Sequence, residues 1–355
     1  MRTIDARVRR AVTAVAAGRP AVVIDDGPAD HQGYLVFAAD AATPALLAFT
    51  IRHTSGYVRV ALPGSECDRL NLPPMWHPGE GRCAAHRVAV DARGPGTGIS
   101  ACDRARTIAA LASPHSAAMD FVRPGHVVPV AAADGGVLAR RGPVEAAADL
   151  ARLAGRGRAA GLCDIVSQER PTAMACGAEL VEFAIEHGLA VVSIGELAAH
   201  RRRTEPQVTR LAEAVVPTPA GQSRVIGFRH VHDGGEHLAV LIGEVGTGAA
   251  VPFHVHVECL TGDVFGSTAC RCAGELDTAL GTMWAAGRGV IVYLRPPGRL
   301  RACGLLDRGL HGGSEVVTWV LRDLGLYAIR LSEDMPGVGL AMFGTIRAQG
   351  LRAVS

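Results

Sequence analysis

The segment Cys259–Cys272 is the most informative stretch of this chain, and it reads Cys-Leu-Thr-Gly-Asp-Val-Phe-Gly-Ser-Thr-Ala-Cys-Arg-Cys. Ten residues separate Cys259 from Cys270, and one residue separates Cys270 from Cys272. Three thiolates suit a zinc ion, and an open fourth position holds a water whose pKa falls toward about 7. Because Cys-x-Cys is a less common ligand spacing than Cys-x-x-Cys, buried structural thiols are the alternative interpretation.

The cysteine count and the N-terminus indicate the compartment. The chain has 9 cysteines, an odd number without dense pairing, which is typical of a reducing cytoplasm. The charged residues Met1–Arg7 lack the apolar core of a secretory signal, so we expect a cytoplasmic protein. We interpret the cysteines outside the segment as core thiols, namely Cys67, Cys83, Cys102, Cys163, Cys176 and Cys303.

The composition excludes several classes of function. All 36 basic residues are arginine, and a guanidinium does not deprotonate near neutral pH, so lysine Schiff-base chemistry is excluded. An anionic ligand would be held by arginine, backbone N–H groups or a metal. The formal charge of +2, with interspersed signs, gives no electrostatic footprint for nucleic acid. Since no apolar run approaches the ~20 residues of a membrane span, we expect no membrane partner either.

Periodicity predicts a layered α/β fold for about the first 200 residues, because helical and strand segments alternate there. We expect helices over residues 3–17, 43–52, 104–112, 144–153, 180–187 and 194–203, and strands over residues 21–24, 58–62, 87–91 and 190–194. The second half predicts strands over residues 223–230, 237–243 and 290–294 and a helix over residues 274–286, as in an α/β or α+β fold. The basic run Arg201–Arg203 before Pro206 marks the boundary, so we predict domains over residues 1–203 and 204–355.

Two sets of motifs resemble known enzyme families. Cys259–Ser267 with Cys270–Cys272 resembles the zinc motif of GTP cyclohydrolase II, and Gly235–Ala239 and Gly287–Val290 fit that family as well. The first half resembles 3,4-dihydroxy-2-butanone-4-phosphate synthase in the segments Ile51–Gly56, Cys67–Leu70, Thr97–Ser100 with Asp103-Arg104, and Arg123–His126. The whole chain therefore resembles the bifunctional riboflavin-pathway enzyme that fuses these activities.

The resemblance implies two reactions. The first half would convert ribulose 5-phosphate into a four-carbon ketone phosphate and formate with a divalent metal. The second half would open the imidazole ring of GTP at zinc. The resemblance also implies a homodimer, and an N-terminal layered α/β synthase-like domain followed by a shortened α/β (α+β) cyclohydrolase II-like zinc domain.

The first half departs from the synthase pattern at positions of the chemistry. The family's metal-binding Glu is matched by Asp30, and its second ligand, a His, is matched by Pro143, which has no side-chain donor atom. In the same acidic loop the family's Arg and last Asp are Ala29 and Tyr34, whereas Arg140 stands where the family has its substrate arginine. We therefore expect an N-terminal Mg²⁺ site that has lost one of its two anchors but still binds a sugar phosphate.

The second half keeps its zinc ligands but departs elsewhere. The family's phosphate-binding Arg is His254, and Pro297 stands where a carboxylate would pair with guanine. The family segment that carries a catalytic Asp, an Arg nucleophile and a Tyr is absent between Asp307 and Val320. Zinc is therefore expected to bind, while GTP recognition lacks some of its partners.

The resemblance assigns candidate residues to three roles. The catalytic candidates are Asp30, Cys270 and Arg299. The candidates for binding a small phosphorylated substrate are Arg52, His53, Thr54, Thr97, Arg140, Glu145, His256, Glu258 and Arg295. The predicted zinc ligands are Cys259, Cys270 and Cys272.

Three hypotheses about function stay open. The departures at both sites favour a rewired zinc-containing hydrolase or lyase in which both original activities are impaired. Such an enzyme would act on a phosphorylated sugar or nucleotide-like metabolite in specialised metabolism. The first alternative is a non-catalytic paralogue that binds a ligand or regulates a partner enzyme, with zinc holding the fold together. The second alternative is residual activity of either original kind in riboflavin biosynthesis.

Overall fold

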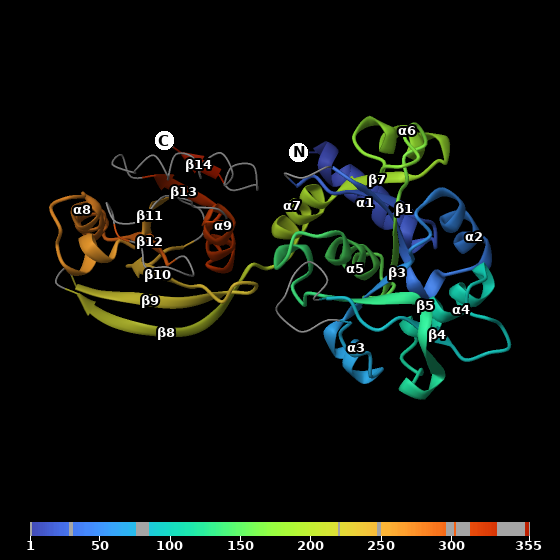
Figure 1. Cartoon of the computed structure of the whole chain (residues 1–355). Helices are drawn as coiled ribbons and strands as arrows, with labels where there is room; N and C mark the ends of the chain where they lie inside the picture. The colour runs from blue at the N-terminus through green and yellow to red at the C-terminus, as the bar shows by residue number, and fades with distance from the viewer. Residues whose placement is uncertain are drawn as a thin grey trace. The chain divides into compact units, whose positions relative to one another are not determined.

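The computed structural model describes residues 2–27, 31–75, 85–218, 221–246, 250–295, 302, 313–331 and 352–354. The chain divides into two compact units, unit 1 (Met1–Arg201) and unit 2 (Arg202–Ser355), and each is built on a seven-stranded sheet (Figure 1). Among the helices within these ranges, none combines the length and the apolar character that crossing a bilayer demands.

The sheet of unit 1 mixes parallel and antiparallel neighbours in the order β4-β5-β3-β6-β2-β1-β7. The central strand β2 is buried along its whole length, as its continuous apolar run requires in a sheet that is covered on both faces. The strands are β1 (Ala21–Ile24), β2 (Gly33–Ala38), β3 (Arg59–Pro63), β4 (Val90–Ala92), β5 (Phe121–Ala132), β6 (Ala160–Asp164) and β7 (Ala190–Ser193).

Helices cover both faces of this sheet, so unit 1 has three layers. Successive residues of β2 point to opposite faces: Val36 packs into one core, and its neighbours Leu35 and Phe37 pack into clusters on the other side. The Val36 face is covered by α1 (Arg2–Ala16), α5 (Pro143–Leu153) and α7 (Ile194–Thr204). The other face is covered by α2 (Pro44–His53), α3 (Gly64–Arg69), α4 (Ala101–Ala112) and α6 (Ala178–Glu186), and short 3₁₀ turns lie at η1 (Ala39–Ala41), η2 (Ala118–Asp120) and η3 (Gly136–Leu138).

Unit 2 also has a helix on each face of its sheet, whose order is β14-β13-β11-β12-β10-β9-β8. On β12, Ile291 packs with Met283 of α8, whereas Val290 and Val292 pack with the core formed by α9. The strands are β8 (Val208–Thr218), β9 (Gly221–His230), β10 (Glu236–Ile242), β11 (Val251–Val257), β12 (Gly289–Leu294), β13 (Ala328–Leu331) and β14 (Arg352–Val354), and the helices are α8 (Cys272–Ala285) and α9 (Gly313–Asp323).

The predicted α/β class is confirmed in both units, but individual elements differ from the expectation. The strand expected over residues 87–91 is the shorter β4, which pairs with β5 across a register shift between Val90 and Asp91. Helix α4 begins three residues before the expected start, because the Ser100 side chain accepts a hydrogen bond from the Asp103 N–H at 3.0 Å and caps the helix there. Periodicity did not predict seven of the described strands, namely β2, β5, β6, β8, β11, β13 and β14.

Candidate functional site

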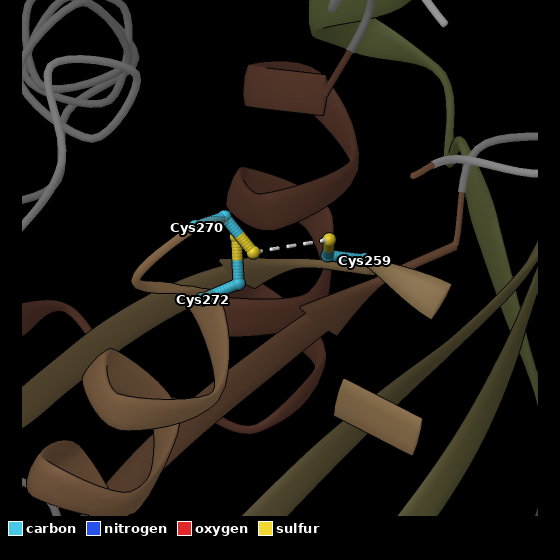
Figure 2. Close-up of side chains that lie close together, drawn as sticks. All are labelled: Cys259, Cys270 and Cys272. Atoms are coloured by element: carbon cyan, nitrogen blue, oxygen red, sulfur yellow. Dashed lines mark hydrogen bonds between the residues drawn. The ribbon is translucent and has the colours of Figure 1, made fainter. Parts of the chain in front are cut away.

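The three predicted zinc ligands come together in unit 2 at the carboxyl end of the parallel strands β11 and β12. Cys259 follows β11, while Cys270 and Cys272 lie at the start of α8. The three sulfur atoms lie within 4.8 Å of one another, and those of Cys259 and Cys270 are 3.8 Å apart (Figure 2). Ligands of open α/β sheets bind outside the carboxyl ends of their strands, so the position of this cluster is that of a binding site.

The donor set and its spacing fit a zinc ion. A tetrahedral ion with Zn–S bonds of about 2.3 Å places two thiolate sulfurs about 3.8 Å apart, which matches the Cys259–Cys270 distance of 3.8 Å. A Cβ added at Gly262 would lie 3.1 Å from the Cys270 sulfur and 3.4 Å from the Cys259 sulfur, so glycine keeps the space beside the sulfurs open.

The carboxylate of Asp263 holds the ligand loop in place. Asp263 lies in a π-helical turn, Leu260–Val264, and accepts hydrogen bonds from the Cys259 N–H at 2.9 Å and the Tyr293 hydroxyl at 2.7 Å. The Nε2 atom of His256 lies 3.0 Å from both carboxylate oxygens. Asp263 thus joins β11, β12 and the loop that carries Cys259, as an outer-shell group does when it orients metal ligands.

Two stacked rings lie beside Asp263. The rings of His256 and Tyr293 stack with centroids 5.2 Å apart. Burial raises the pKa of Tyr293, and its hydrogen bond to Asp263 raises it further, so the phenol stays a neutral donor. His256, a predicted substrate-binding residue, is 4% exposed and directs Nε2 to Asp263. Sequence reasoning missed Asp263 and Tyr293 as site residues, although Asp263 lies within the segment that carried the resemblance.

Glu258 and Arg295 meet beside the cysteines, because they follow the neighbouring strands β11 and β12. Arg295 Nε donates to Glu258 at 3.0 Å, and the Arg295 side chain is 49% exposed. The backbone N–H of Arg295 donates to Nδ1 of His237 at 3.2 Å. Burial, with a smaller contribution from His230, lowers the pKa of His237 to about 4, so its imidazole is a neutral acceptor. The guanidinium of Arg295 therefore reaches solvent next to the cluster.

His254 stands where the resemblance implies a phosphate-binding arginine. Its side chain is 1% exposed, and burial, then the neighbouring His256, lowers its pKa to about 4. A buried neutral imidazole supplies no positive charge for a phosphate at neutral pH. The catalytic candidate Arg299 lies outside the described residues.

In unit 1 the structure brings Arg140 and Glu145 together. Glu145, buried in the first turn of α5, accepts a hydrogen bond from the Ala133 N–H at 3.0 Å and from Arg140 Nε at 2.9 Å. The Arg140 side chain is half exposed. This pairing fixes the guanidinium near the start of α5 and leaves part of it accessible to an anion.

Proline occupies the first position of α5, where the resemblance implies a metal-binding histidine. Pro143 suits this position because its missing N–H would have no partner within the helix. In the acidic loop before β2, residues 28–30 lie outside the described residues. Asp26 of this loop accepts hydrogen bonds from the Ser193 hydroxyl at 2.8 Å and the Gly195 N–H at 2.9 Å. Asp30, the predicted metal ligand, lies outside the described residues.

A tyrosine, an arginine and an aspartate form a cluster where β2, β3 and β6 lie side by side. Tyr34 pairs with Asp164 across β2 and β6. Arg59 donates to Asp164 at 2.7 Å, and its guanidinium carbon lies 5.7 Å from the centre of the Tyr34 ring. Burial, together with the charge of Asp164, raises the pKa of Tyr34 to about 12. Tyr34 is therefore a neutral phenol at the position of the family's last acidic-loop aspartate.

The other candidates of unit 1 are scattered over α2 and the loop before α4. Thr54 is buried and its hydroxyl donates to the Thr50 carbonyl at 2.6 Å. His53 packs against the ring of His187, with centroids 4.6 Å apart. Arg52 and Thr97 are exposed, and neither side chain forms a hydrogen bond with another described residue. Within the described residues, no hydrogen bond joins these four to Arg140 or Glu145.

Comparison with known proteins identifies the family. Residues 9–200 match the family model of 3,4-dihydroxy-2-butanone 4-phosphate synthase, and residues 209–308 match that of GTP cyclohydrolase II. Riboflavin biosynthesis protein RibBA of Rhodococcus erythropolis is 50% identical over 95% of this chain and 87% of its own length. The chain belongs to the RibBA family. RibBA of Nocardia farcinica is 45% identical over 95% of this chain and 88% of its own length.

Solved structures agree with the RibBA architecture. The crystal structure of RibBX, a two-domain 3,4-dihydroxy-2-butanone 4-phosphate synthase from A. baumannii, superposes with a TM-score of 0.72. It is 30% identical and covers 98% of this chain and 99% of its own. A 3,4-dihydroxy-2-butanone 4-phosphate synthase in complex with two magnesium ions has a TM-score of 0.53 and is 38% identical, over 56% of this chain and 97% of its own. The chain is therefore a fusion of the two family modules.

Proposed function

We propose that this chain acts in riboflavin biosynthesis and that unit 2 performs GTP cyclohydrolase II chemistry at a zinc ion held by Cys259, Cys270 and Cys272. The observation that carries the proposal is the meeting of three sulfurs within 4.8 Å in the unit that matches the GTP cyclohydrolase II family. The relatives that are 45% and 50% identical bear a riboflavin biosynthesis name. This favours the riboflavin hypothesis over the rewired enzyme, and a role in specialised metabolism has no support from them.

The residues around the cysteines have different roles in this proposal. A bound zinc ion would supply a Lewis acid and lower the pKa of a water molecule. Asp263 keeps Cys259 in position through the backbone N–H at 2.9 Å. Arg295, half exposed beside the cluster, would bind a phosphate oxygen of the substrate, and Glu258 orients its guanidinium through the 3.0 Å hydrogen bond.

For unit 1, Pro143 favours a second candidate function, the binding of a sugar phosphate without the rearrangement. The rearrangement depends on oxygens polarised by a metal, and the first residue of α5 offers no ligand atom to hold one. Arg140, held by Glu145, still presents a guanidinium that suits a phosphate. Unit 1 would then bind the substrate class of the synthase family and release no formate from it.

The family resemblance also leads us to propose a homodimer in the cytoplasm. Light scattering during size-exclusion chromatography tests the oligomeric state. A mass near 36.9 kDa, that of one chain, would show a monomer instead.

Formate release tests both functions with one product. The purified full chain, loaded with zinc, is expected to release formate from GTP, and with ribulose 5-phosphate and Mg²⁺ it is expected to stay at the background rate. Cys270→Ser should abolish release from GTP, while Cys102→Ser, at an exposed free cysteine, should not change it. No formate from GTP at full zinc occupancy would reject the cyclohydrolase proposal. Formate from ribulose 5-phosphate would reject the second candidate.

A further inference from the structure

Unit 1 contains a cavity that none of the candidate site residues lines. Its volume is about 900 Å³, and it lies between the outer face of α1, one side of α2 and the turn that joins α6 to β7. Pockets that bind small molecules have volumes of roughly 300–1,000 Å³, so the space suits a ligand of moderate size.

One wall of the cavity is basic and its charge is not neutralised. Arg9 and Arg10 on α1 and Arg19 after it line the cavity with exposed side chains. Within the described residues, their guanidiniums form no ion pair or hydrogen bond. Arg7 on the same helix differs, since its Nε donates to Glu196 at 2.7 Å. Three unneutralised cations around one cavity repel each other, and a bound anion would relieve that repulsion.

The rest of the cavity lining is mainly apolar. Leu46, Phe49 and Leu189 supply the apolar surface. The ring of His187 meets that of Phe49 edge to face, with centroids 5.2 Å apart. Nε2 of His187 is buried and has no hydrogen-bond partner among the described residues. An atom that a water molecule cannot reach is not presented to an open cavity, so His187 contributes ring surface and this part of the lining is apolar.

We propose that this cavity binds a small molecule that carries a phosphate group on a flat ring system, as a mononucleotide does. The phosphate contacts the arginines Arg9, Arg10 and Arg19, which form charge-assisted hydrogen bonds with phosphate oxygens. The ring system lies against Phe49 and Leu46. The site is separate from the cysteines of unit 2 and does not depend on the zinc proposal.

Isothermal titration of the full chain with adenosine 5′-monophosphate, adenosine and inorganic phosphate tests this site. Adenosine 5′-monophosphate is expected to bind, and adenosine and phosphate are each expected to bind at least about tenfold more weakly, because each engages only one wall. Arg9→Ala combined with Arg10→Ala should weaken the mononucleotide at least about tenfold. Phe49→Leu should weaken the mononucleotide and leave inorganic phosphate unchanged.

A control with the same loss of charge separates this cavity from general electrostatics and from the site in unit 2. Arg224 and Arg229 are half-exposed arginines of unit 2, and their combined replacement by alanine should leave the mononucleotide affinity unchanged. The proposal is overturned by a mononucleotide affinity weaker than about 1 mM. It is equally overturned if the affinity survives the Arg9 and Arg10 replacements, or falls as much in the control as in those variants.

Discussion

The predicted metal sites of the two units differ in how their ligands are distributed along the chain. In unit 2 the three cysteines belong to one segment, Cys259–Cys272, and their sulfurs meet within 4.8 Å. In unit 1 the two expected ligand positions, residues 30 and 143, are far apart in sequence, and the second is Pro143 at the start of α5. A donor set within one segment needs only the local fold to bring its members together, whereas a set divided between distant elements also depends on the pairing of those elements.

Loss of one cysteine should have the largest effect in the molecule. Cys270→Ser removes one of three sulfurs, so bound zinc is expected to fall from about one ion per chain to below about 0.1. We expect the free energy of unfolding of unit 2 to fall by an amount on the order of 5 kcal/mol, because metal binding contributes to folding. Metal analysis after dialysis and urea unfolding followed by tryptophan fluorescence measure the two effects, and Trp284 and Trp319 report on unit 2.

The matched control for this prediction is Cys102→Ser, which removes an exposed thiol of unit 1 and should change neither quantity. If Cys270→Ser retains a full zinc ion, the cysteines are core thiols, and the contrast between the two units disappears.

Acid should destabilise unit 2 through its buried histidines. His237 and His254 have pKa values of about 4 in the fold, mainly because burial disfavours the charged ring. The stability that they contribute is complete above pH 6.5, the value in the unfolded chain, and is lost as the pH falls from 6.5 to 4. Each shift corresponds to about 3 kcal/mol at most.

His254→Phe tests the acid effect because it keeps a ring beside His256 and removes the titrating group. Urea unfolding at equal zinc saturation between pH 7 and pH 4 should show about half the pH dependence of the original chain. An identical pH dependence in the two chains would show that other groups control acid stability.

Local sequence patterns predicted most helices and the central strand β12 of unit 2, but not the interior strands β6 and β2 of unit 1. The helical spacing of Ile4, Val8, Val12 and Val15 predicted α1, and Val8 and Val15 are buried in the structure. Strand β2 is buried on both faces, so its sequence shows no alternation of apolar and polar residues. Its sequence alone therefore does not identify it as a strand, which becomes evident only from its pairing with β1 and β6. Strand pairing between distant segments is the information that periodicity lacks.

Replacing the supporting carboxylate should have a smaller effect than removing a ligand. Asp263→Asn keeps the size of the side chain but replaces one acceptor oxygen by an amide donor. It therefore cannot accept all the hydrogen bonds from Cys259, Tyr293 and His256. We expect zinc to bind about 10–100-fold more weakly, as for other outer-shell changes. Competition with a chromophoric chelator measures the affinity, and unchanged affinity would restrict Asp263 to a role in folding.

The sequence predicted the ligands of this site but not their support. The cysteine spacing and the family resemblance together named Cys259, Cys270 and Cys272, which the structure brings together. Tyr293 lies on β12, and only the pairing of β11 with β12 brings its hydroxyl to Asp263. The hydrogen bond between His256 and Asp263 could not be predicted either, because it depends on how the loop after β11 folds back onto that strand.

The smallest effect is expected from placing a histidine at the position in unit 1 where the resemblance implies a metal ligand. Pro143→His places an imidazole at the start of α5 and should tighten the binding of Mn²⁺, used as a paramagnetic substitute for Mg²⁺, by about tenfold. Pro143→Ala removes the ring without adding a donor and should leave the affinity at the original low level. Electron paramagnetic resonance titration of free Mn²⁺ measures all three chains after the zinc site has been saturated. Equal and tight binding by the unaltered chain would mean that residues other than 143 complete the metal site. Unit 1 would then have a complete set of metal-donor atoms, as unit 2 does, although residue 143 is proline.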